Sequence, residues 1–367
     1  MTRLSNRHGA INLAQGFPDF SAPETLKSAA IRAIREGYNQ YEISHGSAEL
    51  RKGISRKLRE YNGIKADWDE EITVTCGSSE AMMDTVIALT DPGDDVIILE
   101  PFYENYVPAT IISGATARYV RLYEPDFTFD EEKLKEKFSS KTKLIIINTP
   151  NNPSGRVFTR AELKLVADLC KDYDSIAIAD EIYERIVCRS YTHVSLATLP
   201  GMSDRTVTIS GISKTFSVTG WRVGYAVAPR RLTEAIRKVH DYMTVCAPSA
   251  FQRAAAEGLK MPDSYYESLR DSYERKRRFM LESLSEIGFK CVEPQGAYYI
   301  LADFTEFSKK GDFAFSNYLV RKAAVAVLPA SSFYATGRAG KNMVRFSYCK
   351  KDRTLKDAVE RLKRALN

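Results

Sequence analysis

The sequence predicts an α/β protein, with a mostly parallel sheet of the seven-stranded type flanked by helices and a smaller α+β domain beside it. The first observation is that short β-rich runs alternate with amphipathic helical patterns between residues 70 and 230. The second is that these runs are apolar throughout, which indicates strands covered on both faces and therefore mostly parallel. The third is a long charged helical stretch after residue 260, followed by shorter strand candidates.

The candidate elements follow one another in an order that suits crossover connections. Strands of the large sheet are expected at 71–77, 94–101, 115–122, 142–150, 175–180, 206–211 and 223–229, with helices at 78–90 and 159–173. The long helix is expected at 262–287, and the strands of the smaller domain at 289–294, 296–304, 325–331 and 342–348. We place the large domain at 42–260 and the small domain at 1–41 plus 261–367.

Composition excludes several classes of protein. The chain has 367 residues, of which 44% are hydrophobic, so it can bury a large core in two domains. Its 53 basic and 47 acidic residues alternate along the chain rather than forming blocks, so we expect no nucleic-acid partner. No run approaches the roughly 18 apolar residues of a membrane span, so we expect no membrane partner either.

The cysteines and histidines argue against a metal site. The six cysteines are scattered without a C-x-x-C pair, and the four histidines are too dispersed for the usual zinc spacings. The first residues contain no apolar stretch of signal-peptide length. We therefore expect no metal, a reducing compartment and a cytoplasmic protein.

Polar or aromatic residues follow five of the predicted strands. Ligands of open parallel sheets bind at the carboxyl ends of the strands, because loops and helix N-termini converge there. We therefore expect these residues to share one site. In chain order they are Gly77, Ser78 and Ser79 as one group, then Tyr103, Asn152, Asp180 and Lys214.

Two of these groups also have ordinary structural interpretations. Ser78 and Ser79 would hold a phosphate with the free N–H groups of a helix start, but alone they are more simply helix caps. Asp180 ends the most apolar strand, where a buried carboxylate should meet a cation, in either a structural salt bridge or a catalytic role.

Lys214 lies among small and apolar residues rather than among other charges. A desolvated lysine loses its proton more readily, which makes it a candidate for imine formation with a carbonyl. Arg222 could add a positive charge to a phosphate near the two serines, or form a surface ion pair. The turn that contains Asn152 can still aim its amide into the same site.

The motifs around these residues resemble those of fold-type I pyridoxal-phosphate enzymes, specifically the class I aminotransferases of the aspartate aminotransferase superfamily. The matching motifs are "CGSSEAM", "EPFYENY", "NTPNNPSG", "ADEIYE", "SGISKTFSVTGWRVGY", "EPQGAYYI" and "VRFSY", with "LAQGFPDF" and "YEISHGSAELR" upstream. The resemblance covers almost the whole chain. "INLAQGFPDF" resembles the branch that acts on kynurenine, glutamine, methionine and aromatic amino acids.

This resemblance implies pyridoxal 5′-phosphate as the cofactor and a role for each catalytic residue. Lys214 would form an imine with the cofactor aldehyde and then shuttle a proton to and from the substrate Cα. Asp180 would pair with the pyridine nitrogen and keep it protonated. Tyr183 and Asn152 would hydrogen-bond the 3′ oxygen of the ring, and Tyr103 would stack on its face.

The resemblance also implies how the phosphate is held. Gly77, Ser78, Ser79 and Arg222 would bind it in one subunit. Tyr41 would reach the same phosphate from a second subunit, so a homodimer with shared sites is expected.

The substrate side is implied in the same way. Arg345 would bind the α-carboxylate as a bidentate fork, with Gly16 and Asn152 assisting. Small-molecule partners follow, an amino acid and a 2-oxo acid. No second arginine matches the one that aspartate-specific members use. Phe17, Tyr298 and Tyr334 could form apolar walls of the substrate pocket or could simply belong to the hydrophobic core.

One position departs from the family pattern. Some members have a serine three residues before the lysine as a phosphate ligand, but this chain has Gly211 there. Either Ser210 or Ser213 could substitute for it.

Three functions remain to be separated. The first is an aminotransferase that moves an amino group from an aromatic, methionine-like or glutamine-like L-amino acid to a 2-oxo acid. The second is a carbon–sulfur β-lyase, because the same cofactor cradle supports β-elimination. The third is a non-catalytic module that senses the cofactor or an amino acid, against which an intact Lys214 counts.

Overall fold

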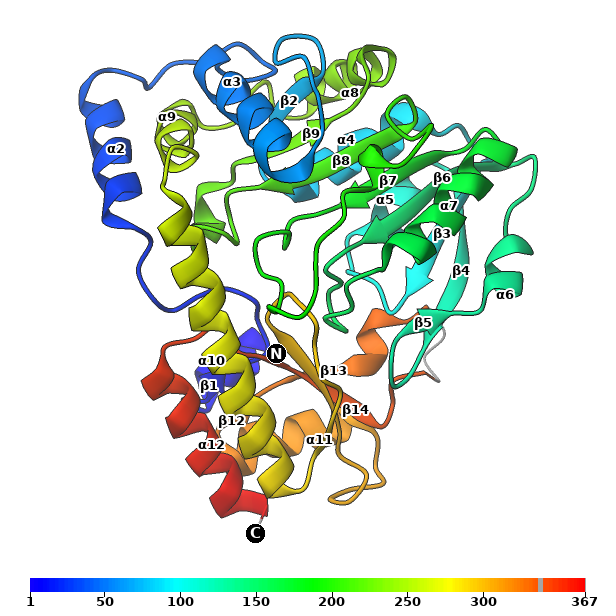
Figure 1. Ribbon diagram of the computed structural model, residues 1–367. Coiled ribbons are helices and arrows are strands. Elements are labelled where there is room, and N and C mark those ends of the chain that lie inside the picture. The colour runs from blue at the N-terminus through cyan, green and yellow to red at the C-terminus, as the bar shows by residue number, and fades with distance from the viewer. Residues whose placement is uncertain (336–338, 367) are drawn as a thin grey trace.

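The long helix α10 (Asp263–Ile287) runs between two halves of the molecule, each built around its own sheet (Figure 1). This computed structural model describes residues 1–335 and 339–366. Both chain ends lie in the half with the smaller sheet (Figure 1). The predicted boundaries, 42–260 for the large domain and 1–41 plus 261–367 for the small one, stay a prediction.

The larger sheet has the predicted α/β architecture. Its strands run in the order β2-β9-β8-β7-β6-β3-β4-β5. All pairs between β8 and β4 are parallel, whereas β9 is antiparallel to both of its neighbours and β5 to β4. Seven strands match the predicted ones, and β5 adds a two-residue edge. The strands are β2 (Ile72–Thr75), β3 (Asp95–Glu100), β4 (Thr116–Tyr123), β5 (Thr128–Phe129), β6 (Thr142–Asn148), β7 (Ile176–Asp180), β8 (Thr206–Gly211) and β9 (Gly224–Val227).

Helices cover both faces of this sheet, because its central strands are apolar on both sides. On β3, Ile97 packs in the cluster that contains Leu163 of α7. Its neighbour Ile98 packs in the cluster that contains Val86 of α4 and Ile236 of α8. One face is covered by α4 (Ser78–Leu89), α5 (Tyr106–Ile112) and α8 (Arg230–Met243), and the other by α6 (Glu131–Lys135) and α7 (Arg160–Asp172).

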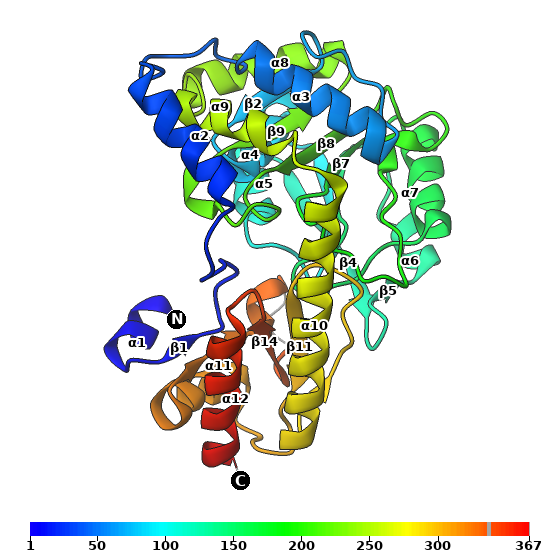
Figure 2. The ribbon, with the colours of Figure 1, turned by 60° about the vertical axis from the view of Figure 1, so that its left-hand side comes forward.

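Three further helices pack at the β2–β9 end of the sheet, namely α2 (Glu24–Arg35), α3 (Ala48–Lys57) and α9 (Ser249–Gly258). Ala29 and Ala30 of α2 pack against Ala254 of α9. Figure 2 shows α2 beside α9 and α3, apart from α1 (Thr2–Arg7) and β1 (Ile11–Asn12). The first 41 residues therefore contact both halves of the molecule.

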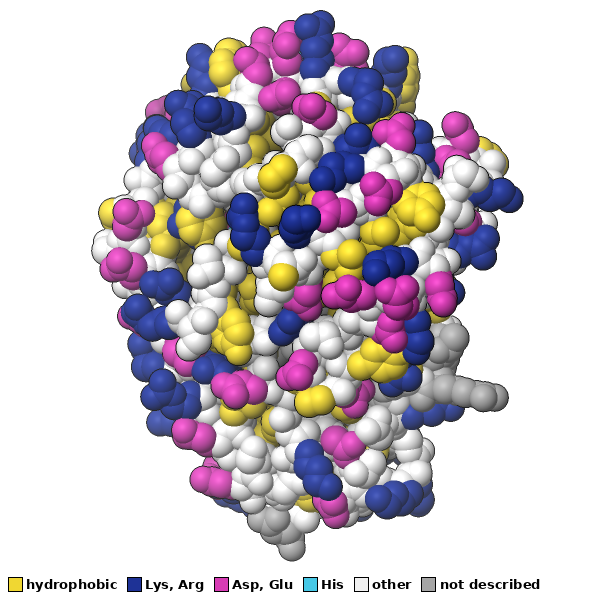
Figure 3. Space-filling model, turned by 45° about the vertical axis from the view of Figure 1, so that its right-hand side comes forward, with side chains coloured by type: hydrophobic (Ala, Val, Ile, Leu, Met, Phe, Trp, Pro, Cys, Tyr) yellow, Lys and Arg dark blue, Asp and Glu magenta, His cyan; other side chains and the backbone are white. Residues whose placement is uncertain are grey.

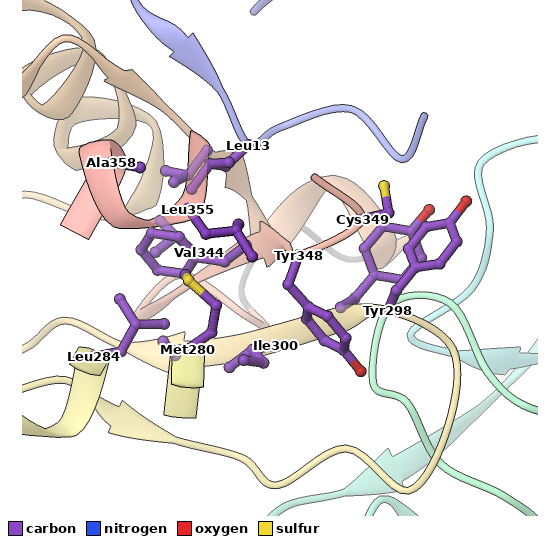
Figure 4. Close-up of a cluster of buried hydrophobic side chains, with 14 of the residues drawn as sticks. Leu13, Met280, Leu284, Tyr298, Ile300, Val344, Tyr348, Cys349, Leu355 and Ala358 are labelled. Atoms are coloured by element: carbon purple, nitrogen blue, oxygen red, sulfur yellow. The ribbon is translucent and has the colours of Figure 1, made fainter. Parts of the chain in front are cut away.

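The smaller half has an antiparallel sheet in the order β10-β11-β14-β13 and a parallel pair of β1 with β12. Its core lies between the sheet, α10 and α12, where Met280 and Leu284 meet Leu355 and Val344 (Figure 4). The elements are β10 (Lys290–Cys291), β11 (Tyr299–Asp303), α11 (Asp312–Tyr318), β12 (Val325–Ala326), β13 (Leu328–Pro329), β14 (Met343–Ser347) and α12 (Asp352–Leu366).

Two predicted strands of the smaller half are shorter than expected. The stretch 325–331 divides into β12 and β13, which pair with different strands, and then turns into a 3₁₀ helix at Ala330–Phe333. Of 289–294, only Lys290–Cys291 pairs in the sheet. The lengths of these strands depend on which neighbouring strands they pair with in the folded protein. Local sequence propensity does not reveal those partners.

Charges of both signs are interspersed on the face shown in Figure 3, with apolar side chains between them and no block of one sign. Within residues 1–335 and 339–366, none of the helices combines the length and the apolar character of a membrane span.

Gly224, at the start of β9, lets this strand pack closely against the backbone of Gly77 and Ser78, two of the predicted phosphate-binding residues. A Cβ there would lie 2.4 Å from Ser78 N and 2.5 Å from Gly77 C. We expect Gly224→Ala to lower the free energy of unfolding by about 2 kcal/mol, because two backbone segments must separate. Gly220→Ala is the matched control, because nothing lies within 4 Å of its added Cβ. Equal urea midpoints for the two variants would contradict this interpretation.

Candidate active site

A cavity of about 570 Å³ opens at the carboxyl ends of the central strands and is closed from the other side by residues of the smaller half. It brings together most of the predicted site. Of the predicted residues, it is lined by Gly16, Ser78, Ser79, Tyr103, Asn152, Asp180, Tyr183, Lys214, Arg222 and Arg345.

Lys214 is positioned just beyond β8, with its amine inside the cavity. Nζ donates a hydrogen bond of 3.3 Å to the carbonyl oxygen of Gly16. It also lies 5.6 Å from the ring centroid of Tyr183 and 5.8 Å from that of Tyr298. Aromatic rings and one carbonyl thus replace most of the water around the ammonium group.

These surroundings lower the pKa of Lys214 to about 8. Burial is the main cause, because it penalises the charged amine. The positive charges of Arg345 and Arg222 act in the same direction, while Asp180 opposes them. With a pKa of about 8, roughly a tenth of the amine is neutral and nucleophilic at pH 7, far more than in an exposed lysine.

Asp180 ends β7 as a buried carboxylate whose hydrogen-bond donors are neutral. Oδ2 accepts a bond of 2.6 Å from the hydroxyl of Tyr106, and Oδ1 accepts one of 3.2 Å from the backbone N–H of Ile182. Burial raises its pKa, and both hydrogen bonds oppose that rise. The sequence predicted a cation beside this carboxylate. Among the described residues, its hydrogen-bond donors are neutral instead.

Sequence reasoning missed Tyr106. This residue begins α5, three positions after Tyr103, in the motif "EPFYENY". Its position after the end of a predicted strand was the available signal. The ring edges of Tyr103 and Tyr106 meet at a centroid distance of 5.8 Å, so one loop supplies both an aromatic wall and the Asp180 donor.

Arg345 is buried on β14 and reaches into the cavity between two aromatic rings. Its guanidinium carbon lies 4.1 Å from the centroid of Tyr299 and 4.7 Å from that of Phe333. Nη1 donates to Asn152 Oδ1 at 2.6 Å, and Nη2 donates to the carbonyl of Ala14 at 2.7 Å. Nε is buried without a described hydrogen-bond partner. Three of the five N–H donors thus remain for an anionic ligand.

Tyr183 and Gly16 are both fixed by Tyr299, another residue that sequence reasoning missed. The hydroxyls of Tyr183 and Tyr299 share a hydrogen bond of 2.9 Å. A Cβ on Gly16 would lie only 1.9 Å from the Tyr299 hydroxyl oxygen, so only glycine fits there. Tyr298 donates to the carbonyl of Gly16 at 2.8 Å.

The start of α4 and the Arg222 guanidinium lie together at one corner of the cavity. Ser78 and Ser79 open this helix after Gly77, whose φ of 83° favours glycine. Arg222 has a φ of 52° and donates from Nη2 to the carbonyl of Cys76 at 3.2 Å. A Cβ on Gly77 would lie 2.1 Å from that nitrogen. Gly77 therefore does not line the cavity itself but lets Arg222 approach the helix start.

The two serines proposed to replace the residue at Gly211 lie in different environments. A Cβ on Gly211 would come within 2.9 Å of Gly224 Cα, so that position leaves little space for a serine. Ser210 is buried and donates to Glu184 at 3.0 Å, outside the cavity. Ser213 lines the cavity. Of the two, only Ser213 can reach a ligand there.

Tyr41 does not reach the cavity of its own chain, and 81% of its surface is exposed. Phe17 lines the cavity, whereas Tyr298 and Tyr334 are buried and are not among its lining residues.

Two groups of acidic residues with a histidine lie outside the cavity, and each brings three side chains within 4.8 Å of one another. In one group Lys57 donates to Glu184. In the other His240 contacts Glu80 at 2.9 Å. Because donors of the protein itself contact these carboxylates, we assign no metal to either group.

Residues 8–362 match the sequence profile of the family aminotransferase class I and II. The chain belongs to this family. The aminotransferase is 36% identical over 363 residues to the methionine aminotransferase of Escherichia coli (strain K12), which covers 99% of this chain and 94% of that protein. It is also 36% identical to the kynurenine–oxoglutarate transaminase 3 of Mus musculus, over 100% of this chain and 87% of that protein.

Solved structures agree with the fold of the aminotransferase. N-succinyldiaminopimelate aminotransferase from Mycobacterium tuberculosis superposes with a TM-score of 0.97 at 36% identity, over 100% of this chain and 96% of the other. A double mutant of Thermus thermophilus aspartate aminotransferase gives 0.91 at 33% identity, over 98% and 93%. This chain is thus a transaminase that moves an amino group between an amino acid and a 2-oxo acid.

Aminotransferases of this family depend on pyridoxal 5′-phosphate, and the cavity fits this cofactor. Lys214 offers an amine with a lowered pKa for its aldehyde. Asp180 offers a buried carboxylate, whose donors among the described residues are neutral, for a protonated ring nitrogen. The start of α4 with Arg222 offers N–H groups and a positive charge for the phosphate.

The amine of Lys214 in the cofactor-free aminotransferase is expected to titrate near its pKa of about 8. Arg345→Met should move the midpoint to higher pH, because it removes a positive charge that disfavours the ammonium form. Asp180→Asn should move it to lower pH, because it removes a negative charge that favours that form. Pulse labelling with acetic anhydride, read at Lys214 by mass spectrometry against the unfolded protein, measures these midpoints. Midpoints that match the unfolded chain would contradict the burial argument.

Proposed function

We propose that this aminotransferase takes its amino group from L-amino acids with an aromatic, methionine-like or glutamine-like side chain. The observation that carries the proposal is the cavity lining. Among the described residues that line it, the lysine and arginine side chains are Lys214, Arg222 and Arg345, each with a proposed task of its own. A second carboxylate on the substrate would therefore find no further lysine or arginine side chain among these lining residues.

The remaining walls suit an uncharged side chain. Phe17, Leu328 and Phe333 supply apolar surface, and Gln15 supplies an amide. The relatives described above carry methionine and kynurenine in their names, which supports the same substrate class.

We assign the proton transfer to Lys214. Its neutral amine would hold the cofactor and, once the substrate has displaced it, would take the proton from the substrate Cα as a general base and give it back as a general acid. The bound cofactor supplies the electron sink that makes this Cα–H acidic. The hydrogen bond to Gly16 and the flanking rings of Tyr183 and Tyr298 keep the amine at one place.

Asp180 holds a proton on the ring nitrogen of the cofactor. A buried carboxylate with a raised pKa gains most from a positive partner, and a protonated pyridine nitrogen provides one. Tyr106 donates to Oδ2 and so fixes the direction in which the carboxylate faces. Tyr103 lies beside Tyr106 in the cavity wall, placed to stack on the ring.

Arg345 binds the α-carboxylate of the substrate, with the backbone at Gly16 opposite. Asn152 and the carbonyl of Ala14 already hold two of its N–H groups, so the guanidinium is oriented before the substrate arrives. The amide nitrogen of Asn152 remains for the 3′ oxygen of the ring, together with the hydroxyl of Tyr183.

The phosphate is held by backbone and side chains at the start of α4, by Ser78 and Ser79 with Arg222, and Gly77 keeps this corner open. Ser213 is the cavity serine that can take the place of the one absent at Gly211.

Tyr41 completes the phosphate site from a second subunit, so the enzyme is a homodimer. The support is a cluster of exposed apolar side chains on two neighbouring segments, which Ser249 joins by donating to the carbonyl of Gln40. An apolar surface of this kind marks an interaction site. Its members and exposures are Tyr41 81%, Ile43 53%, Tyr242 94%, Met243 52% and Val245 46%.

A cytoplasmic location is proposed from the cysteines. All six are free in the described part of the chain, and Cys170 and Cys349 are buried. Free thiols are typical of a reducing compartment.

The proposal on substrates is tested by single half-reactions. The enzyme loaded with pyridoxal 5′-phosphate is mixed with one amino acid at a time, and the absorbance of the cofactor is followed without any 2-oxo acid. We expect methionine, glutamine and aromatic amino acids to convert the cofactor at least tenfold faster than aspartate, because of the missing cation. Faster conversion by aspartate would overturn the substrate class. Pyruvate and ammonia from cystathionine would reveal β-elimination instead.

The same assay tests the role of Lys214. Lys214→Ala should retain the cofactor through its phosphate but lose at least a thousandfold in rate, because both the covalent link and the proton carrier are missing. Appreciable turnover by this variant would contradict the role.

Shared sites are tested by mixing two inactive variants. Lys214→Ala and Tyr41→Ala chains are refolded together, so that mixed dimers contain one site with both residues intact. Recovery of about a quarter of wild-type activity is expected for random pairing, since half of the dimers are mixed and each has one good site. Each variant refolded alone is the control. No recovery in a mixture that contains mixed dimers would contradict the crossing of Tyr41.

A further inference from the structure

His240 joins two segments that both belong to the proposed phosphate site. It lies on α8, and its side chain is fully buried. Nδ1 is 2.9 Å from Glu80 Oε1, on the first turn of α4. Nε2 is 2.7 Å from the carbonyl oxygen of Ser44, three residues after Tyr41.

The two contacts set the protonation of the ring. Ionised Glu80 and the Ser44 carbonyl can only accept hydrogen bonds, so both ring nitrogens of His240 must carry a proton. His240 is then an imidazolium ion. Asp84 Oδ2 lies 3.6 Å from Nδ1 in the same buried space.

The electrostatic surroundings agree with this protonation. Burial opposes the charge, but the neighbouring carboxylate of Asp84 and the hydrogen bond to Glu80 raise the pKa of His240 to about 10. Besides these two groups of α4, the thiol of Cys76 faces this network from the preceding loop. Burial and the neighbouring Glu80 raise the pKa of that thiol to about 11, so it is neutral at physiological pH.

Glu80 carries the connection to the phosphate corner. Its second oxygen accepts from the backbone N–H of Cys76, and Oε1 also accepts from Thr244. The carbonyl of Cys76 in turn accepts from Arg222 Nη2 at 3.2 Å. One continuous set of hydrogen bonds therefore runs from His240 through Glu80 and Cys76 to Arg222.

The Ser44 contact carries the connection to the dimer side. The segment from Gln40 to Gly46 holds Tyr41, and Val74 on β2 donates to the carbonyl of His45 at 3.0 Å. His240 is the charged group that ties this segment to α4.

We propose that His240 is a positioning residue for the cofactor phosphate. Its side chain holds the start of α4 and Arg222 at a fixed place relative to the segment that carries Tyr41. The inference rests on the proposed phosphate site at Ser78, Ser79 and Arg222. It adds a residue that lines no part of the cavity.

His45 provides a matched control one residue from Ser44. Burial, with Arg237 and Arg51 close by, lowers the pKa of His45 to about 4, so its imidazole is neutral. Replacing it removes a histidine of the same segment without removing a charge.

The experiment measures the affinity of the cofactor-free, full-length protein for pyridoxamine 5′-phosphate. This ligand has the phosphate but no aldehyde, so Lys214 does not react with it. At about pH 7.5 we expect His240→Gln to weaken binding about tenfold, because a charge-assisted hydrogen bond is lost. The ratio of wild-type to variant affinity should shrink as the pH rises through about 10, where wild-type His240 loses its extra proton. His45→Gln should bind as the wild type does.

Arg222→Gln separates the two proposals. If it weakens binding and His240→Gln does not, the phosphate site stands and the role of His240 is wrong. If neither variant weakens binding, both are wrong. A loss in His240→Gln that is constant from about pH 7 to about pH 10.5 means a merely structural role and also overturns the inference.

A measurement on the wild type covers the case in which His240→Gln does not fold. The chain has four histidines, so ¹⁵N-histidine NMR can resolve them. At about pH 8.5 we expect one ring with protons on both nitrogens, assigned to residue 240 because both of its contacts are acceptors. Four neutral rings at that pH would overturn the inference.

Discussion

The separation of a buried carboxylate from a desolvated amine is the constraint on which the structure of the site depends. Asp180 ends the central strand β7, and its carboxylate accepts from the neutral donors Tyr106 and Ile182, while Lys214 donates to a backbone carbonyl. Neither group satisfies the other by a direct ion pair. In the function proposed above, one cofactor would engage both groups, because its protonated ring nitrogen would pair with the carboxylate and its aldehyde would react with the amine.

The two halves of the molecule contribute differently to that site. The larger sheet supplies Asp180, Lys214 and the start of α4 to the cavity, because its parallel strands end at one edge. The smaller half supplies Arg345 and also fixes the backbone from Ala14 to Asp19 across the cavity. Lys350 donates to the carbonyl of Phe17 at 2.6 Å, and Thr354 donates to Asp19 at 2.6 Å. Arg345 and this backbone are therefore positioned by contacts between residues more than 300 positions apart in the sequence.

Strand ends were predictable from the sequence, and side-chain partners were not. The apolar runs located the strands that carry Asp180 and Lys214, and the family motifs located Arg345. Tyr106, Tyr299 and the His240 network follow from pairs of side chains that meet only after folding, and no periodicity marks them. The division of 325–331 into two strands could not be predicted for the same reason, because β12 and β13 pair with different strands. Tyr41 is 81% exposed, so its own chain gives little sign of the role proposed for it.

The unbroken course of α10 has a mechanical consequence. Its 25 residues span about 37 Å, from Pro262 beside the larger sheet to Gly288 in the left-handed conformation at the far end. Such a rod acts as a lever, because hydrogen bonds along its length resist bending. A rotation of about 5° at the Pro262 pivot would displace the other tip by about 3 Å, a distance comparable to one hydrogen bond. Angular changes at that pivot are thus magnified toward the Gly288 end of the helix.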